Sequence, residues 1–125
     1  GRVFVPLRGD DNLDRILSLV ADLLRREETT ATLFHATTAD EREYGQSLLD
    51  DAAGRLVEAG IDRARINTRL ATTNDPGTAI VELAHEFDLL VVGETEPSLT
   101  DRILGRVSTR IANEVDRPAF VVRKA

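Results

Sequence analysis

The feature that most constrains the fold is a regular alternation of strand patterns and helix patterns along the whole chain. The clearest strand is "LLVVG" (89–93), which has no polar residue before its glycine, as a strand covered on both faces requires. Apolar residues at helical spacing fill the stretches between strands. Strands that alternate with helices predict a parallel sheet with right-handed crossovers and helices on both faces.

Five strands and four helices are expected from these patterns. The strands are residues 2–7, 30–36, 65–70, 89–93 and 118–122. The first three helices have the apolar stripes Leu13, Ile16, Leu17, Val20, Leu23, Leu24, then Tyr44, Leu48, Leu49, Ala52, Leu56, Val57, then Ile80, Leu83, Ala84, Phe87; the fourth has Leu99, Ile103, Leu104, Val107, Ile111 and Val115. The predicted fold class is α/β: an open doubly wound five-stranded parallel sheet in a three-layer α/β/α sandwich.

Local residues mark where several of these helices begin and end. Asp10 and Asp11 are cap candidates for the first helix, which is expected to end near Glu27, and Gly60 suits the end of the second. The stretch "NDP" (74–76) supplies two cap candidates and a first-turn proline for the third helix. The helix boundaries are therefore predicted from cap chemistry as well as from periodicity.

The length and composition predict one domain over residues 1–125. The chain has 125 residues, of which 42% are hydrophobic, enough for one compact core. It contains no methionine, which we interpret as excision from a longer protein, with removal of an initiator methionine as the alternative. No apolar run approaches the roughly 18 residues that cross a bilayer, so direct membrane insertion is not expected. The absence of cysteine fits a cytoplasmic location.

The charged residues are unevenly distributed between types. Fifteen basic residues are arginine and only Lys124 is lysine, against 22 acidic residues and a net charge of −6. Nucleic acid is not an expected partner, because no basic cluster is present to neutralise phosphates. A lysine-poor acidic surface predicts a salt-adapted source. GC-rich coding also favours arginine, so the skew has two open explanations.

Ligands of doubly wound sheets bind outside the carboxyl ends of strands, where the strand order reverses. The turns to consider are therefore "LRGDD" (7–11) and "GETEPS" (93–98). The dinucleotide fingerprint and the P-loop are absent from both. Leu70 and Ala71 stand where a receiver domain has its phosphate-accepting aspartate. These three classes are excluded.

The remaining resemblance is to the universal stress protein family. It rests on "VFVPLRG" (3–9), "ATLFHA" (31–36), "DPGTAIVELAHEFDLLVVG" (75–93) and "ILGRVSTRIANEVDRPAFVVR" (103–123), and covers nearly the whole chain. The resemblance implies the strand order 3-2-1-4-5, a homodimer through the fifth strand, a role in stress response and, in one branch, ATP binding.

In the ATP-binding branch, an aspartate follows strand one, and strand four leads into G-x-x-G, nine residues, then glycine with serine or threonine. Gly93 and Gly105 match the first and last glycines, and Ser108 matches the small hydroxyl residue that often follows. Arg8 stands in place of the aspartate, and Arg106 in place of the serine or threonine.

Two further changes make the loop a poor triphosphate site. Glu96 replaces the second glycine, and the loop is one residue short. A degraded ATP site is therefore expected, with no cofactor. Because Arg8, Arg102 and Arg106 can pair with an anion, the candidate anion or nucleotide site is Gly93, Gly105, Arg106, Ser108 and Arg8.

No catalytic or metal site is expected. His35, near the end of strand two, is interpreted as a packed or hydrogen-bonded histidine, and His85 as a solvated helix residue. Asp10, Asp11 and Asp14 resemble a metal cluster, but helix capping is the preferred interpretation.

The sequence thus predicts a non-enzymatic regulatory and dimerisation domain. Because universal stress domains also occur fused to transporters, it is expected either alone or as the cytosolic tail of a membrane transporter. A nucleotide-binding stress sensor and a weak nucleotide hydrolase are the alternatives, although no base, nucleophile and orienting group can be assembled from the turns.

Overall fold

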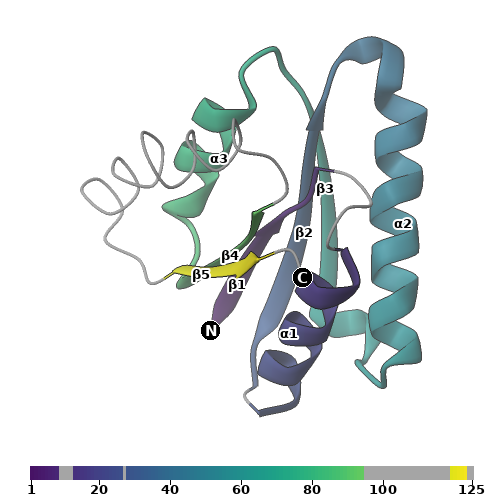
Figure 1. Ribbon diagram of the computed structural model, residues 1–125, viewed down its shortest axis with the longest axis vertical. Helices are drawn as coiled ribbons and strands as arrows, with labels where there is room; N and C mark the ends of the chain where they lie inside the picture. The colour runs from purple at the N-terminus through teal and green to yellow at the C-terminus, as the bar shows by residue number, and fades with distance from the viewer. Residues whose placement is uncertain (9–12, 27, 95–118, 124–125) are drawn as a thin grey trace.

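A computed structural model describes residues 1–8, 13–26, 28–94 and 119–123, with the main chain alone at residues 93–94 and 119–123. Its centre is a five-stranded sheet in the order β3-β2-β1-β4-β5 (Figure 1). Every neighbouring pair is parallel. The α/β class and the parallel sheet are confirmed. The strands are β1 (Arg2–Pro6), β2 (Thr30–Thr37), β3 (Ile66–Thr72), β4 (Leu89–Glu94) and β5 (Ala119–Arg123).

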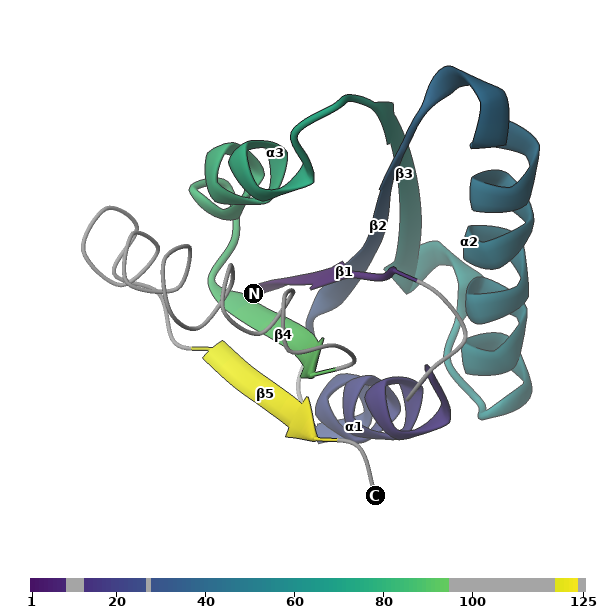
Figure 2. The ribbon, with the colours of Figure 1, turned by 45° about the horizontal axis from the view of Figure 1, so that its top comes forward.

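Helices cover both faces of the sheet. The described residues contain three α-helices: α1 (Leu13–Arg26), α2 (Arg42–Glu58) and α3 (Pro76–Ala84). Helices α1 and α2 lie on one face and α3 on the other, which gives three layers (Figure 2). Two short 3₁₀ turns, Ala39–Glu41 and Arg63–Arg65, precede α2 and β3. The predicted fourth helix, from Leu99 to Val115, lies outside the described residues.

Each face of the sheet has its own apolar core. The first core joins alternate residues of β1 and β2 to α1 and α2. The second joins Phe4 and Phe34 to α3 and to Phe87, which follows that helix. The ring of Phe4 lies 4.8 Å from that of Phe87 and 5.4 Å from that of Phe34, between ring centroids. Burial on both faces is what the apolar strands require.

The apolar stripe predicted for α2 is wrong at both ends. Tyr44 is 51% exposed and Val57 is 42% exposed. The buried side of the helix instead includes Gly45 and Ala53, beside the predicted Leu48, Leu49, Ala52 and Leu56. The face that meets the sheet is therefore narrower and built from smaller residues than a count of large apolar residues suggests.

Predicted helix signals were more accurate than predicted strand ends. Asp75 caps α3 by accepting a hydrogen bond from the Thr78 main-chain N–H at 3.2 Å, with Pro76 next to it. Gly60 follows α2 with a φ of 98°, a conformation that glycine adopts without strain. Strand β1 ends one residue early, at Pro6, whereas β3 continues to Thr72 and β4 continues past Gly93 to Glu94.

Arginine side chains bind main-chain carbonyl groups at the ends of the elements. Arg65 donates to the carbonyl of Leu24, near the end of α1, and to that of Thr29 at 3.0 Å. Arg25 donates to the Ala59 carbonyl at 2.8 Å, after α2. The last carbonyls of a helix have no partner within it, and a guanidinium can satisfy two acceptors at once. These contacts connect helix ends to distant parts of the chain.

We predict that Arg65→Lys lowers the free energy of unfolding by about 1 to 2 kcal/mol, because lysine offers a single donor centre where Arg65 contacts two carbonyl groups. Chemical denaturation measures the change. The matched control is Arg69→Lys, an exposed position on β3, for which a change within about 0.5 kcal/mol is expected. If both variants lose the same free energy of unfolding, the carbonyl contacts of Arg65 do not stabilise the fold as predicted.

Candidate functional site

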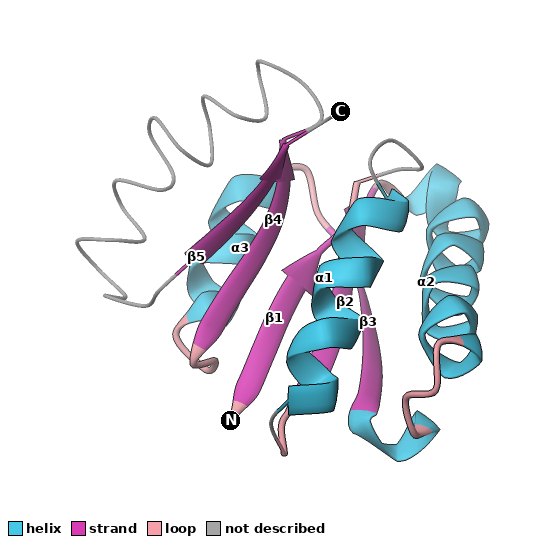
Figure 3. Cartoon of the chain, turned by 60° about the horizontal axis from the view of Figure 1, so that its bottom comes forward, coloured by secondary structure: helices cyan, strands magenta, loops and turns pink. Residues whose placement is uncertain are grey.

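The point where the strand order reverses lies between β1 and β4. Strand β1 is central, with β2 on one side and β4 on the other, although β4 comes much later in the chain. Because all strands are parallel, their carboxyl ends meet at one edge of the sheet (Figure 3). This edge is where doubly wound sheets bind their ligands. We therefore place the candidate site at the carboxyl ends of β1 and β4.

Pro6 explains why β1 and β4 pair over so short a distance. The Asp88 N–H donates to the Arg2 carbonyl on the β4 side, whereas the Leu7 N–H donates to Phe34 of β2. Main-chain groups alternate between the two sides of a strand, so Pro6 is turned toward β4. A proline has no N–H to donate. The β1–β4 register accordingly ends at Phe4↔Leu90, two residues before Pro6.

Strand β4 instead remains paired with β5 beyond this point. Their register runs from Leu90↔Ala119 to Glu94↔Arg123. The main chain of β1 and that of β4 thus take different partners toward the carboxyl edge. This divergence lies at the switch point, the part of a doubly wound sheet where ligands bind.

Only part of the predicted anion site can be located. Arg8 follows Leu7 at the carboxyl end of β1, and its side chain is exposed. Gly93 does not end β4, because it is paired with Val122 inside the strand. Gly105, Arg106 and Ser108 lie outside the described residues, as do Glu96, Arg102, Asp10 and Asp11. The structure therefore places Arg8 and Gly93 at one edge and leaves the rest of the set as a prediction.

His35 is buried against the same edge. It lies on β2 with 6% of its surface exposed, and its Nδ1 atom is 2.8 Å from the carbonyl oxygen of Leu7. The ring also meets the edge of the Tyr44 ring, with the centroids 6.5 Å apart. The interpretation of His35 as a packed, hydrogen-bonded histidine is confirmed. That of His85 as an exposed residue, at the end of α3, is confirmed as well.

Gly45 allows α2 to approach the His35 ring. A Cβ atom added to Gly45 would lie 2.8 Å from the ring carbon Cδ2 of His35 and 2.8 Å from Leu70 Cδ1. Both distances are shorter than atoms tolerate without moving. Sequence reasoning missed this contact. The available signal was a glycine inside a helical pattern, where it costs about 1 kcal/mol and therefore indicates a packing constraint.

A second group of polar residues lies at the ends of β2 and β3. Arg42, the first residue of α2, donates to the hydroxyl of Thr72 at the end of β3. The Thr73 N–H donates to the Thr37 carbonyl at 3.0 Å. The first bond joins the start of α2 to the end of β3, and the second joins the ends of β3 and β2. The sequence carried no local signal for the first bond, since Arg42 and Thr72 are 30 residues apart.

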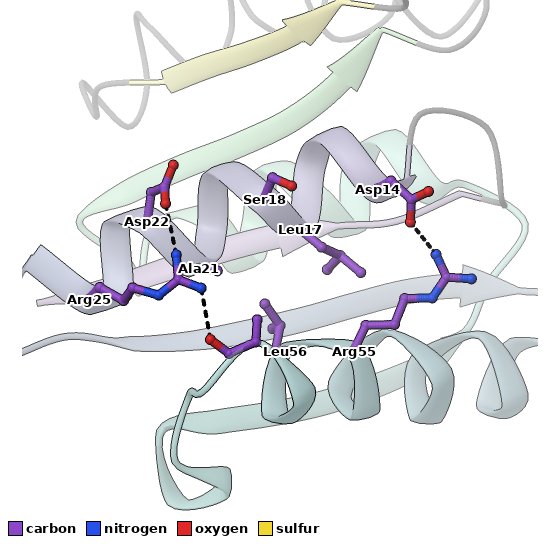
Figure 4. A pocket seen from close by; sticks show the side chains of 9 residues that line it. Asp14, Leu17, Ser18, Ala21, Asp22, Arg25, Arg55 and Leu56 are labelled. Atoms are coloured by element: carbon purple, nitrogen blue, oxygen red, sulfur yellow. Dashed lines mark hydrogen bonds and ion pairs between the residues drawn. The ribbon is translucent and has the colours of Figure 1, made fainter.

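The hollow between α1 and α2 is a separate feature, with a volume of about 410 Å³ (Figure 4). Its floor includes Leu17 and Leu56, and the Asp14–Arg55 ion pair, 2.5 Å between charged atoms, crosses one end. At the other end Arg25 binds both Asp22, at 2.9 Å, and the Ala59 carbonyl. These polar groups already bind one another. We therefore interpret the hollow as part of the packing between α1 and α2 and not as a ligand site.

The described part of the chain contains neither a metal-ligand cluster nor a membrane-spanning helix. There, no three His, Cys, Asp or Glu residues gather closely enough to hold a metal ion. Asp14, the one described member of the predicted aspartate group, pairs with Arg55. The helices of residues 1–8, 13–26 and 28–94 include none with the length and apolar character to cross a membrane.

Residues 1–123 match the universal stress protein family. The chain belongs to that family. It is 30% identical over 97 residues to universal stress protein G of Salmonella typhimurium, a match that spans 71% of this chain and 66% of the relative. The universal stress protein G of Salmonella typhi matches to the same extent.

Solved universal stress proteins also share the fold. One, crystallised in complex with cAMP, is 26% identical with a TM-score of 0.75, over 99% of this chain and 97% of that one. A universal stress protein from Archaeoglobus fulgidus, in complex with dAMP, is 17% identical with a TM-score of 0.73, over 97% and 96% of the two chains. The second likeness establishes the fold alone. The observed order β3-β2-β1-β4-β5 is the one expected from the family resemblance.

We predict opposite effects for two glycine-to-alanine changes on α2 of this universal stress domain. Gly45→Ala lowers the free energy of unfolding by about 1 to 3 kcal/mol, because the new methyl group meets the rigid His35 ring. Gly54→Ala raises it by about 0.5 to 1 kcal/mol, since nothing lies within 4 Å of an added Cβ and alanine favours a helix. Thermal and chemical denaturation of both variants measure the difference. Stabilisation by Gly45→Ala would contradict the close approach of α2.

Proposed function

We propose that this chain is a non-enzymatic regulatory domain of the universal stress type whose switch-point turns do not hold ATP as the ATP-binding members do. The observation that carries the proposal is the exposed Arg8 at the carboxyl end of β1. The ATP-binding branch has an aspartate there. A guanidinium only donates hydrogen bonds and a carboxylate only accepts them, so ligand donors that suit the aspartate find no acceptor in Arg8.

The sequence of the turn after β4 supports the same conclusion. Glu96 stands where a glycine would let the main chain approach phosphate. A carboxylate about 6 Å from one phosphate charge is repelled by roughly 0.7 to 2.8 kcal/mol at effective dielectric constants between about 80 and 20. A triphosphate meets this repulsion more than once. The loop is also one residue short of the ATP-binding pattern.

The surroundings of His35 support a role without catalysis. Its Nδ1 is bonded to the main-chain carbonyl of Leu7, and its ring packs against Tyr44 and the backbone of α2 at Gly45. A catalytic histidine needs a nucleophile or a substrate within hydrogen-bond reach. The contacts of His35 are those of a structural histidine.

We predict that ATP binds with a dissociation constant of about 1 mM or weaker, with or without Mg²⁺, since Arg8 replaces the aspartate after β1 and the turn after β4 is short and carries Glu96. Isothermal titration calorimetry measures the affinity. The combined variant Arg8→Asp, Glu96→Gly and Arg106→Ser, with one residue added to the loop, is expected to bind ATP more tightly. Glu96→Gly alone is the matched control and leaves the affinity weak, because the loop is still short.

The outcome that would overturn this proposal is ATP bound by the unaltered protein at micromolar concentration. ATP that copurifies at about one molecule per chain would do the same.

A nucleotide with one phosphate group is a second candidate ligand. The observation that favours it is the 26% identical universal stress protein in complex with cAMP. A cyclic monophosphate carries one negative charge, so it meets the repulsion from Glu96 only once, and the fork of Arg8 suits phosphate geometry. If the domain is a nucleotide-binding sensor, we predict that cAMP binds at least about tenfold more tightly than ATP. Isothermal titration calorimetry with each nucleotide measures the two affinities. Equal affinity, or no cAMP binding, would remove the candidate.

We further propose that the domain forms a homodimer through the free side of β5. Strand β5 is the last in the sheet order and pairs with β4. Its residues "AFVV" carry no charge until Arg123, so the strand lacks the usual protection against pairing with another edge. At the opposite edge, β3 exposes Arg69, whose charge opposes pairing with a copy of itself.

Fusion to a transporter stays a prediction that the full length of the encoding gene tests.

We predict that the protein is a dimer at micromolar concentration in high salt, as measured by light scattering. Successive N–H groups of a strand point to opposite sides, so one of Val121→Pro and Val122→Pro removes an N–H that faces outward. That variant is expected to be a folded monomer, with Val57→Lys, on the exposed side of α2, as a dimeric control. A monomeric parent protein, or dimers in both proline variants, would show that the interface lies elsewhere.

A further inference from the structure

We propose that His35 is a positioning residue for the ligand edge: its ring holds the end of β1 and sets the direction in which the chain leaves the sheet toward Arg8. The inference rests on the second candidate of the proposed function, in which a nucleotide with one phosphate group binds at this edge. The contact that carries it is the 2.8 Å hydrogen bond between Nδ1 of His35 and the carbonyl oxygen of Leu7, the residue before Arg8.

The hydrogen bond fixes the proton on the ring. A carbonyl oxygen can only accept, so Nδ1 must carry the hydrogen. The other nitrogen, Nε2, faces α2, where a Cβ on Gly45 would lie 3.5 Å from it. A buried polar side chain is retained at low cost only where it is hydrogen-bonded. An apolar side chain at this position would fill the space and need no hydrogen-bond partner. The bond to Leu7 is therefore what histidine adds over an apolar core residue.

The bond is placed where the regular sheet ends. The β1–β2 register runs to Pro6↔Phe34, and the Leu7 N–H still donates to the Phe34 carbonyl at 2.7 Å. On the other side, Pro6 has ended the pairing with β4. Both main-chain groups of Leu7 are therefore bonded to β2, the N–H to the Phe34 carbonyl and the carbonyl group to the His35 ring. The orientation of the following peptide unit, and with it the start of Arg8, depends on this contact.

The surrounding structure is built to keep the ring in place. Gly45 has no side chain where α2 crosses the ring, although glycine costs about 1 kcal/mol in a helix interior. Leu70 of β3, which is in register with His35, and the edge of Tyr44 close the remaining sides. Two elements, α2 and β3, thus border the imidazole. A ring so confined has one orientation, and that orientation presents Nδ1 to Leu7.

The first test needs no ligand. In the wild type, two-dimensional ¹H–¹⁵N spectra of the imidazole groups are expected to show His35 protonated at Nδ1, unlike the exposed His85. His35→Leu removes the donor, and we expect amide hydrogen exchange at Leu7 and Arg8 to rise about fivefold relative to that of Leu33 in the centre of β2. His35→Asn keeps an N–H at nearly the same position and is expected to restore at least half of the protection. His85→Leu is the matched control and leaves exchange unchanged.

The second test uses cAMP as the probe. Its affinity, measured by calorimetry, is expected to fall about fivefold in His35→Leu, to recover in His35→Asn and to stay unchanged in His85→Leu.

Protonation at Nε2 alone in the wild type, or equal rises in exchange at Leu7 and Leu33 in His35→Leu, would overturn the positioning role. If the wild type binds no cAMP while the exchange results hold, the nucleotide proposal fails and the positioning of the β1 turn stands. If His35→Leu does not fold, the wild-type tautomer and His35→Asn decide: loss of Leu7 protection in His35→Asn would count against the role.

Discussion

The burial of β1 on both faces is the constraint on which the rest of the structure depends. Phe4 and Val5 have no exposed surface, and they point to opposite cores. A strand buried on both sides needs helices above and below it and a hydrogen-bonded strand on either edge. The chain meets this need with β2 and β4 beside β1, α1 and α2 on one face and α3 on the other. Because Pro6 has no N–H to donate, the pairing of β1 with β4 ends before the carboxyl edge. This is the place where the strand order reverses.

Arginine contributes to this structure through hydrogen bonds to main-chain carbonyl groups as well as through ion pairs. Arg2 donates to the Glu86 carbonyl at 2.8 Å and lies 4.6 Å from the centre of the Phe87 ring, which fastens the start of β1 to the segment before β4. Arg63 and Arg65 bind carbonyl groups around the start of β3. A lysine cannot replace a planar group that reaches two acceptors and stacks on a ring. These contacts give the excess of arginine a structural use, beside the two explanations that composition suggested.

Much of the fold could be predicted from the sequence because its signals are local. Short apolar runs between helical patterns identified the strands, Asp75 identified the start of α3, and Gly60 identified the end of α2. The errors arise where distant segments decide the outcome. Tyr44 and Val57 are apolar at helical spacing, but the face of α2 that meets the sheet is set by how closely Gly45 can approach His35. For the candidate site, the strand patterns predicted the carboxyl edge of the sheet, where the structure places Arg8; the binding of a ligand there stays a prediction. The Leu7–His35 bond and the effect of Pro6 on β4 involve residues far apart in the chain, and only the structure reveals them.

The central proposal is that the carboxyl edge, where β1 and β4 diverge, is the ligand-binding part of this universal stress domain. Chemical-shift mapping tests it most directly, with ¹H–¹⁵N spectra recorded during a titration with cAMP. The account predicts that the largest shifts fall on main-chain amides at the ends of β1, β2 and β4, including Leu7, Arg8, Thr37 and Gly93, with little change along α1 and α2. Shifts concentrated instead on the hollow between those two helices, around Leu17 and Leu56, or no shifts at millimolar cAMP, would contradict it.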